Sequence, residues 1–353
     1  FSQAHQASGA QARALAHAVL MYARHIEELE ALGPLVGQMV SKHVALQVQA
    51  EHYPIVGTCL LRAIREVLGP EVATDTVIDA WGAAYQQLAD ILINAEGEVY
   101  DALAEAPGGW RGARAFRVTG KRPESAEITS FELTPVDDQP VLDFTPGQYI
   151  GLRLVIDGEE VRRNYSLSAA PNGRSYRISV KREPEGLVSR HLHDHVGEGD
   201  ALDLFPPAGD FTLGDSDRPL VLISGGVGIP PTLAMAEAGL DNSTRPVIFI
   251  HYARNAEVHG FGRQIDEWGR LHRQFQAFLA YEDPAPDGER QPDAVGRPAR
   301  EHFERWLPAD RNVDCYLLGP KPFMAFVNRT LKDLGVPPRQ IRYEFFGPAQ
   351  ALQ

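Results

Sequence analysis

Residues 163–168 (RNYSLS) bring three chemically different side chains together within four positions. They end a run, 161–168, with the composition of a β-strand, in which successive side chains alternate between two faces. Arg163 offers a fork of donors that suits a pyrophosphate, Tyr165 a flat face for an isoalloxazine ring, and Ser166 a hydroxyl for the edge of that ring. The run is therefore a candidate flavin-binding strand, although an ordinary half-buried strand would show the same pattern.

A glycine-rich turn is the second candidate site. The apolar run 220–224 leads directly into residues 225–228 (GGVG), and a helix is predicted from about Pro231. This order favours a pyrophosphate, because free backbone N–H groups and the helix dipole meet at the N-terminus of the helix. The motif differs from the GxGxxG dinucleotide fingerprint, so a purely structural tight turn fits it as well.

His43 is the third candidate, on the apolar face of a predicted helix at 35–46. A histidine on such a face is often a core residue, but an imidazole is also a common ligand of haem iron. Tyr53 follows ten residues later within HYPIVG, and Glu96 belongs to a further predicted helix. These neighbours favour the haem interpretation of His43.

These candidate residues must be positioned by the secondary structure around them. Residues 1–105 are predicted to be helical throughout. A linker at 106–110 (APGGW) stops the last helix, since its proline and glycines do not continue one. Within residues 1–105, apolar side chains recur at spacings of three and four. This spacing predicts helices at 11–32, 35–46, 53–68 and 76–100.

From residue 112 the pattern changes to short β runs separated by turn signals such as Pro146-Gly147. Many short strands with regular turns predict an antiparallel β-barrel over 112–216. The predicted strands are 115–119, 128–133, 149–154, 161–166, 176–181 and 201–205.

From residue 217 apolar strands alternate with helices, which predicts an α/β domain with a parallel sheet over 217–353. We expect the Pro- and acid-rich residues 283–299 to form a surface loop. The predicted parallel strands are 219–224, 247–251, 276–280 and 315–318.

Composition narrows the class of protein. Of the 353 residues 44% are hydrophobic and 23% charged, as is ordinary for globular domains. The net charge of −13 argues against non-specific nucleic-acid binding and against an anionic membrane surface. Two cysteines far apart exclude a disulfide scaffold and a zinc finger, and fit a reducing cytoplasm. No apolar run is long enough for a membrane anchor.

Three motifs in this order resemble the ferredoxin–NADP reductase superfamily: RxYS at 163–166, GGVG at 225–228 and LGPKPFM at 318–324. There a barrel holds FAD and an α/β domain holds NAD(P)H, so the resemblance implies both cofactors. By this resemblance FAD contacts Tyr149, Arg163, Asn164, Tyr165 and Ser166. The dinucleotide phosphates would contact Gly225, Gly226, Val227, Gly228, Ile229 and Pro230.

The C-terminal segment 343–348 (YEFFGP) looks like the tail of the same superfamily, which packs an aromatic side chain over the flavin. A plain terminal strand is the alternative. The tail residues that the resemblance assigns are Glu344, Phe345, Phe346, Gly347 and Pro348.

Two positions depart from the superfamily pattern. Pro230 stands where relatives usually carry threonine, and Leu318 where they usually carry the cysteine before Gly-Pro. Both positions lie near the nicotinamide in that superfamily, and hydride transfer depends on how that ring faces the flavin. We expect function to be retained with slower hydride transfer. Arg254, beyond the strand 247–251, is a candidate for a 2′-phosphate, but NADH and NADPH both remain open.

The helical region resembles the globin domain of bacterial flavohaemoglobins, and the resemblance then runs continuously from Phe1 to Pro348. It rests on dense matches, among them YPIVG at 53–57, DAW at 79–81 and YRISVKRE at 176–183. In relatives two helices and part of a third precede the residue that matches Phe1, and they supply a distal tyrosine. We therefore expect a truncated globin domain in a fragment of a longer protein.

Carried over residue by residue, the resemblance makes His43 the proximal iron ligand and places Tyr53 and Glu96 with it in a triad. A carboxylate and a phenol beside the imidazole increase the electron density on iron, which favours O₂ activation over storage. The other residues assigned are Phe1 as a haem wedge, Gln11 and Leu15 as a distal pair, and Lys42 with Glu344 as a charged pair near the haem–flavin route.

The resemblance thus implies a cytoplasmic nitric oxide dioxygenase that oxidises NO to nitrate with O₂ and NAD(P)H through FAD and haem b. Its partners are small molecules, and we expect a monomer. The predicted domains are a globin domain at 1–105, a linker at 106–111, an FAD-binding barrel at 112–216 and an NAD(P)-binding domain at 217–353. The alternatives are an FAD-dependent NAD(P)H reductase with a non-functional haem module, and a haem-based gas sensor.

Overall fold

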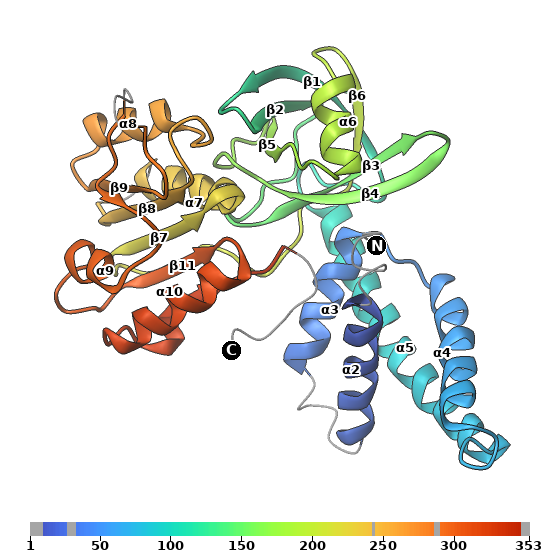
Figure 1. Cartoon of the computed structure of the whole chain (residues 1–353). Coiled ribbons are helices and arrows are strands. Elements are labelled where there is room, and N and C mark those ends of the chain that lie inside the picture. The colour runs from blue at the N-terminus through green and yellow to red at the C-terminus, as the bar shows by residue number, and fades with distance from the viewer. Residues whose placement is uncertain (1–9, 27–32, 242–243, 286–289, 347–353) are drawn as a thin grey trace.

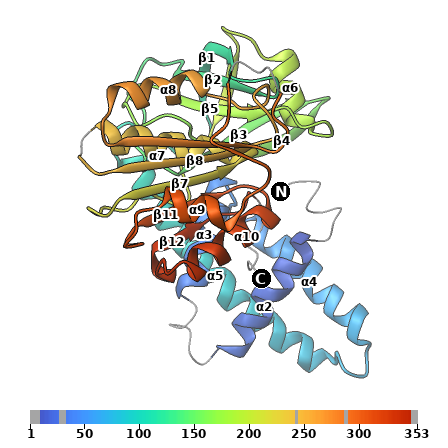
Figure 2. The same cartoon turned by 60° about the vertical axis from the view of Figure 1, so that its left-hand side comes forward.

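The computed structural model describes residues 10–26, 33–241, 244–285 and 290–346. Its elements form three groups along the chain: a helical bundle, an antiparallel barrel and a parallel sheet covered by helices (Figure 1). The bundle projects away from the other two groups in both views (Figure 1, Figure 2). No helix in these ranges is long and apolar enough to span a membrane.

The bundle confirms the predicted helices to within about five residues, except that the first helix ends at Arg24 and residues 25 and 26 form a turn where the helix was predicted to continue to 32. Residues 27–32, which were expected to continue the first helix, lie outside the described part of the chain. The helices are α2 (Ala10–Arg24), α3 (Gly33–Ala45), α4 (His52–Leu68) and α5 (Asp75–Glu105).

The long helix α5 organises the bundle. Its first turn is capped by the Thr74 side chain, which accepts a hydrogen bond from the Val77 amide (3.4 Å). One face of α5 is apolar and packs against the other helices, because the apolar residues recur at helical spacing. The buried core comprises Tyr22, Val40, Val44, Tyr53, Leu88, Ala89, Leu92 and Tyr100.

Helix α4 is less buried than its apolar pattern indicates. Ile55 is 64% exposed and Val67 is 82% exposed, although both are apolar residues of the predicted helix 53–68. The described contacts of α4 run along α5, through Tyr53 and through Gly57, where a Cβ would lie 2.5 Å from the Tyr85 ring. Such a narrow line of contact covers only part of the apolar face.

The linker is packed against the barrel. The backbone of Gly108 has a φ of +74°, and a Cβ there would lie 2.4 Å from the Val141 carbonyl oxygen. Trp110 is buried in the barrel core, and its Nε1 donates to the Leu204 carbonyl (3.2 Å). The segment that ends α5 therefore also fixes the bundle to the barrel.

The barrel is a six-stranded sheet in the order β4-β3-β6-β1-β2-β5. An antiparallel bridge between Leu167 and Ile178 joins the end of β4 to β5 and closes the sheet. Its strands match the predicted runs and are β1 (Arg114–Pro123), β2 (Ile128–Pro135), β3 (Tyr149–Ile156), β4 (Glu159–Ser166), β5 (Tyr176–Lys181) and β6 (Ala201–Leu204). The helix α6 (Leu187–His195), which was not predicted, lies between β5 and β6 and buries Val188 and Leu192 in the core.

The third group is a parallel sheet in the order β10-β9-β8-β7-β11-β12. Along β7, Leu220 and Leu222 face one apolar cluster while Val221 and Ile223 face another, as the two-residue period of a strand requires. The strands are β7 (Leu220–Gly225), β8 (Val247–Ala253), β9 (Phe275–Tyr281), β10 (Ala294–Val295), β11 (Asp314–Leu318) and β12 (Ile341–Tyr343).

Helices cover both faces of this sheet. Helices α7 (Ile229–Asp241) and α8 (Gly262–Leu271) contribute to one cluster, and α9 (Arg300–Trp306) and α10 (Lys321–Asp333) to the other. Short 3₁₀ turns stand before α7 (Gly226–Gly228) and before β12 (Pro338–Gln340). The expectation of a loop at 283–299 was wrong in one respect, because β10 lies there and pairs with β9.

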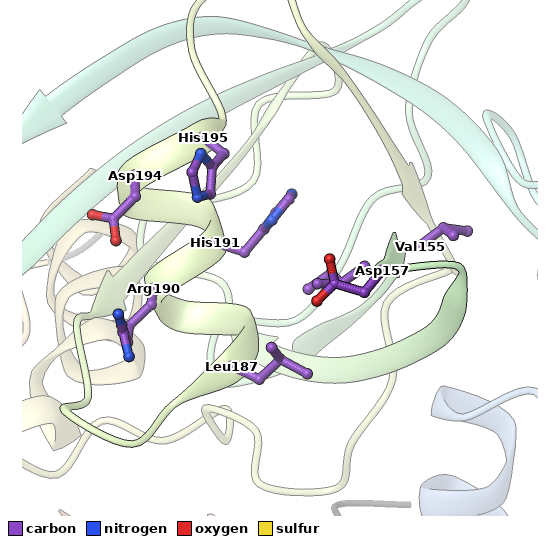
Figure 3. A pocket seen from close by; sticks show the side chains of 8 residues that line it. Val155, Asp157, Leu187, Arg190, His191, Asp194 and His195 are labelled. Carbon is purple, nitrogen blue, oxygen red and sulfur yellow. The ribbon is translucent and has the colours of Figure 1, made fainter.

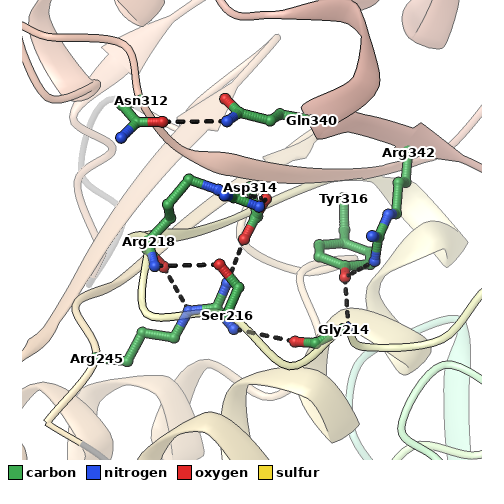
Figure 4. Close-up of polar contacts among 9 residues, drawn as sticks. All are labelled: Gly214, Ser216, Arg218, Arg245, Asn312, Asp314, Tyr316, Gln340 and Arg342. Atoms are coloured by element: carbon green, nitrogen blue, oxygen red, sulfur yellow. Dashed lines mark hydrogen bonds and ion pairs between the residues drawn. The ribbon is translucent and has the colours of Figure 1, made fainter.

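A buried ionic network holds the start of β11 (Figure 4). Asp314 accepts hydrogen bonds from Arg218 (2.8 Å) and Arg245 (2.8 Å), and the Arg245 and Asp314 side chains are each only 8% exposed. In the same strand the Tyr316 hydroxyl accepts from the Gly214 amide (2.7 Å) and from Arg342. These contacts tie the segment that leaves the barrel to both β11 and β12.

Candidate active site

Three helices bring His43, Tyr53 and Glu96 into one hydrogen-bonded group. His43 comes from α3, Tyr53 from the first turn of α4 and Glu96 from α5. The Glu96 Oε1 atom lies 2.7 Å from His43 Nδ1 and accepts a hydrogen bond of 2.5 Å from the Tyr53 hydroxyl. The Tyr53 oxygen and His43 Nδ1 are 3.1 Å apart. The structure thus assembles the three residues that the sequence singled out.

The electrostatics of this group determine the direction of its hydrogen bonds. Glu96 is buried, at 2% exposure, and only its carboxylate can accept from both neighbours. Burial raises the pKa of the Tyr53 phenol well above its usual range, and the hydrogen bond to Glu96 raises it further. Tyr53 therefore stays protonated and donates, and His43 donates through Nδ1. The His43 Nε2 atom has no hydrogen-bond partner within the described ranges, so its lone pair is available to a metal.

Two tyrosines that the sequence interpretation missed hold this group in place. The Tyr85 hydroxyl donates to the Tyr53 carbonyl (2.8 Å), and the Tyr100 hydroxyl donates to the Val48 carbonyl (2.8 Å). Both lie on α5, on the side that faces the connection between α3 and α4. The sequence did contain a signal for them, because each places a polar hydroxyl on an otherwise apolar helix face.

Of the predicted distal residues, the structure describes the side chain of Leu15. Leu15 lies on α2 and is 40% exposed. Phe1 and the side chain of Gln11 lie outside the described residues. Their roles remain predictions.

The flavin candidates lie at the paired ends of β3 and β4. Tyr149 pairs with Ser166, and Ile150 with Tyr165, in an antiparallel register. Opposite residues share a face, so Tyr149 and Ser166 lie on one face and Tyr165 on the other. Tyr165 packs partly against the barrel core, where burial raises the pKa of its phenol.

Two further candidates flank Tyr165 on β4. Arg163 shares its face, and the Nη1 atom donates to the Arg162 carbonyl (2.7 Å). Its Nε and Nη2 atoms make no hydrogen bond within the described ranges, which leaves donors for an anionic ligand. Asn164 is exposed on the opposite face.

The C-terminal end of α3 docks onto this part of the barrel. The Ser41 hydroxyl donates to Asp210 Oδ1 (2.6 Å), and Arg162 Nη1 donates to the Leu46 carbonyl (2.7 Å). The Ala45 carbonyl approaches Gly151 of β3 so closely that a Cβ there would lie 2.5 Å from it. The helix that carries His43 thus contacts the strand pair that carries the flavin candidates.

Lys42 and Glu344 meet at the same interface. Burial raises the pKa of Glu344 to about 7, while the Lys42 charge opposes that shift. Burial likewise lowers the pKa of Lys42, against the attraction of Glu344 and Asp210. Lys42, Glu344 and Asp210, the last of which sequence reasoning missed, are therefore close enough to shift one another's pKa, while the role of the Lys42–Glu344 pair remains a prediction.

The glycine turn lies where the strand order of the parallel sheet reverses, between β7 and β11. Ligands of open α/β sheets bind in such a crevice, at the carboxyl ends of the strands. A Cβ at Gly228 would lie 2.6 Å from the Leu318 carbonyl oxygen, and one at Gly225 would lie 3.2 Å from the Phe323 ring. Gly226 has a φ of +53°, and a Cβ there would meet open space.

The neighbours of this turn limit its hydrogen-bonding capacity. Ile229, Pro230 and Pro231 open α7, and the two prolines have no N–H to donate. Val227 and Ile229 therefore carry the amides that remain for a phosphate beside those of the glycines. Leu318 is fully buried in the apolar cluster under α7.

The C-terminal tail leaves the sheet after a short strand. β12 ends at Tyr343, whose ring meets that of Phe345 edge-on at 5.9 Å. Phe345 is partly buried against the cluster under α10, and Phe346 is 51% exposed. Gly347 and Pro348 lie outside the described residues.

Arg254 follows β8 and is engaged by the barrel. Its guanidinium pairs with Glu127 in the turn between β1 and β2. The other carboxylate oxygen of Glu127, Oε2, lies 3.9 Å from Lys181 Nζ. The Ala126 amide donates to the Glu257 carbonyl beside it (2.8 Å). Arg254, the candidate ligand of a 2′-phosphate, is therefore held in an ion pair between the parallel-sheet domain and the barrel.

Comparison with protein-family models matches three segments of the chain. A globin family matches residues 1–92, an oxidoreductase FAD-binding domain residues 115–213, and an oxidoreductase NAD-binding domain residues 222–329. These segments fall within the predicted ranges 1–105, 112–216 and 217–353, whose bounds remain predictions.

Curated relatives match over the whole chain. A flavohaemoprotein of Pseudomonas aeruginosa is 64% identical over 352 residues, covering 100% of this chain and 89% of the relative. Flavohaemoproteins of a Burkholderia species and of Halalkalibacterium halodurans are 63% and 44% identical, covering 100% of this chain and 89% and 88% of those relatives.

Solved structures agree with this. A flavohaemoglobin of Malassezia yamatoensis with bound FAD and haem has a TM-score of 0.83 and 27% identity, covering 98% of this chain and 88% of that one. The FAD/NAD-binding domain of a nitric oxide dioxygenase from Vibrio cholerae has a TM-score of 0.62 and 38% identity, covering 67% of this chain and 100% of that one. The fold, the triad and these matches over the full length together show that this chain belongs to the flavohaemoprotein family.

Proposed function

We propose that this chain is a nitric oxide dioxygenase, which oxidises NO to nitrate with O₂ and NAD(P)H and uses haem b and FAD. The hydrogen-bonded group of His43, Glu96 and Tyr53 carries the proposal, because it prepares an imidazole as a strongly donating metal ligand. The Vibrio cholerae protein, whose FAD/NAD-binding domain matches this chain, is a nitric oxide dioxygenase.

The residues present fit a haem iron. His43 Nδ1 is hydrogen-bonded to the Glu96 carboxylate, and Nε2 has no partner in the described ranges. Histidine ligands of metals are commonly oriented in this way, with the nitrogen that does not bind the metal hydrogen-bonded to a carboxylate. The carboxylate makes the imidazole a better donor, and this favours activation of bound O₂. We assign the distal side to Phe1, Gln11 and Leu15 by the family resemblance.

The residues present also fit FAD and a dinucleotide. The spare donors of Arg163 suit a pyrophosphate, and the Tyr149–Ser166 end of the strand pair suits a flat ring and its polar edge. The open space at Gly226 and the start of α7 suit the second pyrophosphate. By the family resemblance we assign the FAD contacts to Tyr149 and to residues 163–166, and the nucleotide phosphate contacts to residues 225–230.

When bound, FAD converts the hydride of NAD(P)H into single electrons, and haem supplies the iron at which O₂ and NO react. The chain positions these groups. Glu96 and Tyr53 orient the His43 ring, and the contacts of Ser41 with Asp210 and of Arg162 with Leu46 hold α3 on the barrel. Phe323 and the Leu318 backbone pack against the glycine turn and set the width of the nucleotide crevice.

The test uses the chain loaded with haem and FAD. NO consumption, nitrate formation and NADH oxidation are followed together, and about two NO should be consumed per NADH because a hydride carries two electrons. His43→Ala should abolish the Soret band and NO consumption while NADH still reduces the flavin. His272→Ala, which changes a histidine at the end of α8 in the parallel-sheet domain, is the control and should behave like wild type. NADH oxidation without nitrate formation would instead favour the reductase alternative.

A further inference from the structure

A shallow cavity of about 460 Å³ lies on the barrel between α6 and the turn that joins β3 to β4. Figure 3 shows His191 and His195 on the face of α6 that borders this cavity, with Asp157 on the opposite side. The rest of the lining is Val155, Ile156, Leu187, Arg190 and Asp194. None of these residues has a part in the haem, flavin or nucleotide sites described above.

The two walls of the cavity are set by the local sequence. Asp157 and Gly158 have φ values of +54° and +82°, the left-handed pair of a tight hairpin turn, so Asp157 is held at the rim. On the other side Val188 and Leu192 anchor α6 in the barrel core. Because residues at i and i+4 share a helix face, His191 and His195 are then directed together toward the outside.

The geometry of this histidine pair is that of a chelating site. The ring centroids of His191 and His195 are 5.3 Å apart, and neither ring makes a hydrogen bond within the described ranges. Two histidines four residues apart on one helix face are a known arrangement for binding a single zinc ion. His193, between them, is used differently, since its Nε2 contacts the Val180 carbonyl (2.8 Å) inside the domain.

The surrounding charges define what the pair can bind. Asp157 adds negative charge across the cavity, whereas the Asp194 carboxylate is held by Arg182 (2.8 Å) and Arg190 adds positive charge at the rim. No group of three histidine, cysteine or carboxylate side chains in the described ranges is placed to hold a metal. The site therefore offers two protein nitrogens, and water must complete the coordination. Imidazole selects Zn²⁺, Cu²⁺, Ni²⁺ or Co²⁺ over Mg²⁺ or Ca²⁺.

We propose that His191 and His195 chelate one divalent transition-metal ion on the surface of the barrel, at a site separate from the haem. The ion bridges two successive turns of α6 and faces the carboxylate of Asp157. Metal held there stiffens the C-terminal half of α6, because both ligands belong to the same helix.

Zinc titration of the haem- and FAD-loaded chain, with any purification tag removed, tests the proposal. Wild type should bind one Zn²⁺ more than His191→Ala or His195→Ala, in which the affinity at this site falls on the order of 10²-fold because chelation becomes single attachment. His272→Ala, at the end of α8, is the matched control and should keep the wild-type affinity. Unchanged zinc affinity in both α6 variants would overturn the proposal.

A second measurement needs no substitution. Zn²⁺ should slow amide hydrogen exchange in residues 187–195 of the wild-type chain and leave α8 unchanged. Equal exchange in α6 with and without saturating Zn²⁺ would also refute the site, whether or not the variants fold.

Discussion

Gly151→Ala should uncouple the helical bundle from the barrel while leaving the barrel's own chemistry intact. A Cβ at this position would lie 2.5 Å from the Ala45 carbonyl and 2.9 Å from the Phe205 ring, closer than carbon atoms approach without displacement. Overpacking of this kind costs about 1–3 kcal/mol. Undocking of α3 from the barrel would relieve this strain. The same free energy then shifts the equilibrium between docked and undocked α3 about 5- to 150-fold, at 1.4 kcal/mol per factor of ten.

Anaerobic stopped-flow measurement on the haem- and FAD-loaded chain separates the two halves of the reaction. Flavin reduction by NADH should proceed as in wild type, whereas the following haem reduction should slow by roughly the same 5- to 150-fold factor. Gly120→Ala is the control, because a Cβ there would lie 3.5 Å from the Glu132 side chain, an ordinary contact in the same barrel. Haem reduction at the wild-type rate in Gly151→Ala would refute the argument that this contact positions His43.

Four further outcomes follow from single contacts. Glu96→Gln removes the charge that faces His43 Nδ1, so the haem midpoint potential should rise by about 60 mV per 1.4 kcal/mol lost, as a redox titration would show. Glu127→Gln frees Arg254 and should improve the KM for NADPH relative to NADH by up to about fivefold, the limit for an exposed ion pair, whereas a constant ratio would exclude Arg254 as a 2′-phosphate ligand. Asp314→Asn leaves buried arginine charge uncompensated and should lower the unfolding free energy by about 3–5 kcal/mol in a urea titration, where a loss under 1 kcal/mol would contradict the network. Because burial raises the pKa of Glu344 to about 7, the folded state holds its proton more tightly than the unfolded state. Stability should therefore fall as the pH rises from about 4.5 through 7 in wild type, and Glu344→Gln should remove that part of the pH dependence in thermal unfolding scans.

Strands and helices were predictable wherever the apolar period was long enough to show which face is buried. Apolar and polar residue types alternate along β5, and its predicted range is confirmed, although Tyr176 to Val180 are all buried. α6 was missed because only two of its buried residues, Val188 and Leu192, are apolar, and nine residues are too few to distinguish a helical period from a polar loop. The short β10 was missed for the same reason.

The candidate triad was predictable, but its quality as a site was not. The helical pattern singled out His43, and the family resemblance placed Tyr53 and Glu96 with it. The structure adds that one carboxylate oxygen serves both neighbours, and that Tyr85 and Tyr100 hold the backbone around it. Such contacts join residues tens of positions apart, so no local pattern in the sequence records them.

Gly151 shows where sequence reasoning stops. An isolated glycine inside a strand indicates that another backbone approaches closely, and this signal stood in the predicted strand 149–154. The identity of that backbone depends on how two domains dock, which local periodicity does not encode. It is the Ala45 carbonyl, two residues beyond His43, and this proximity makes the strand pair of the flavin candidates a support for the helix that carries His43. A glycine inside a strand adds little to the packing of the barrel itself. At Gly151 it is nevertheless required, because a side chain there would block the contact between the barrel and the helical bundle.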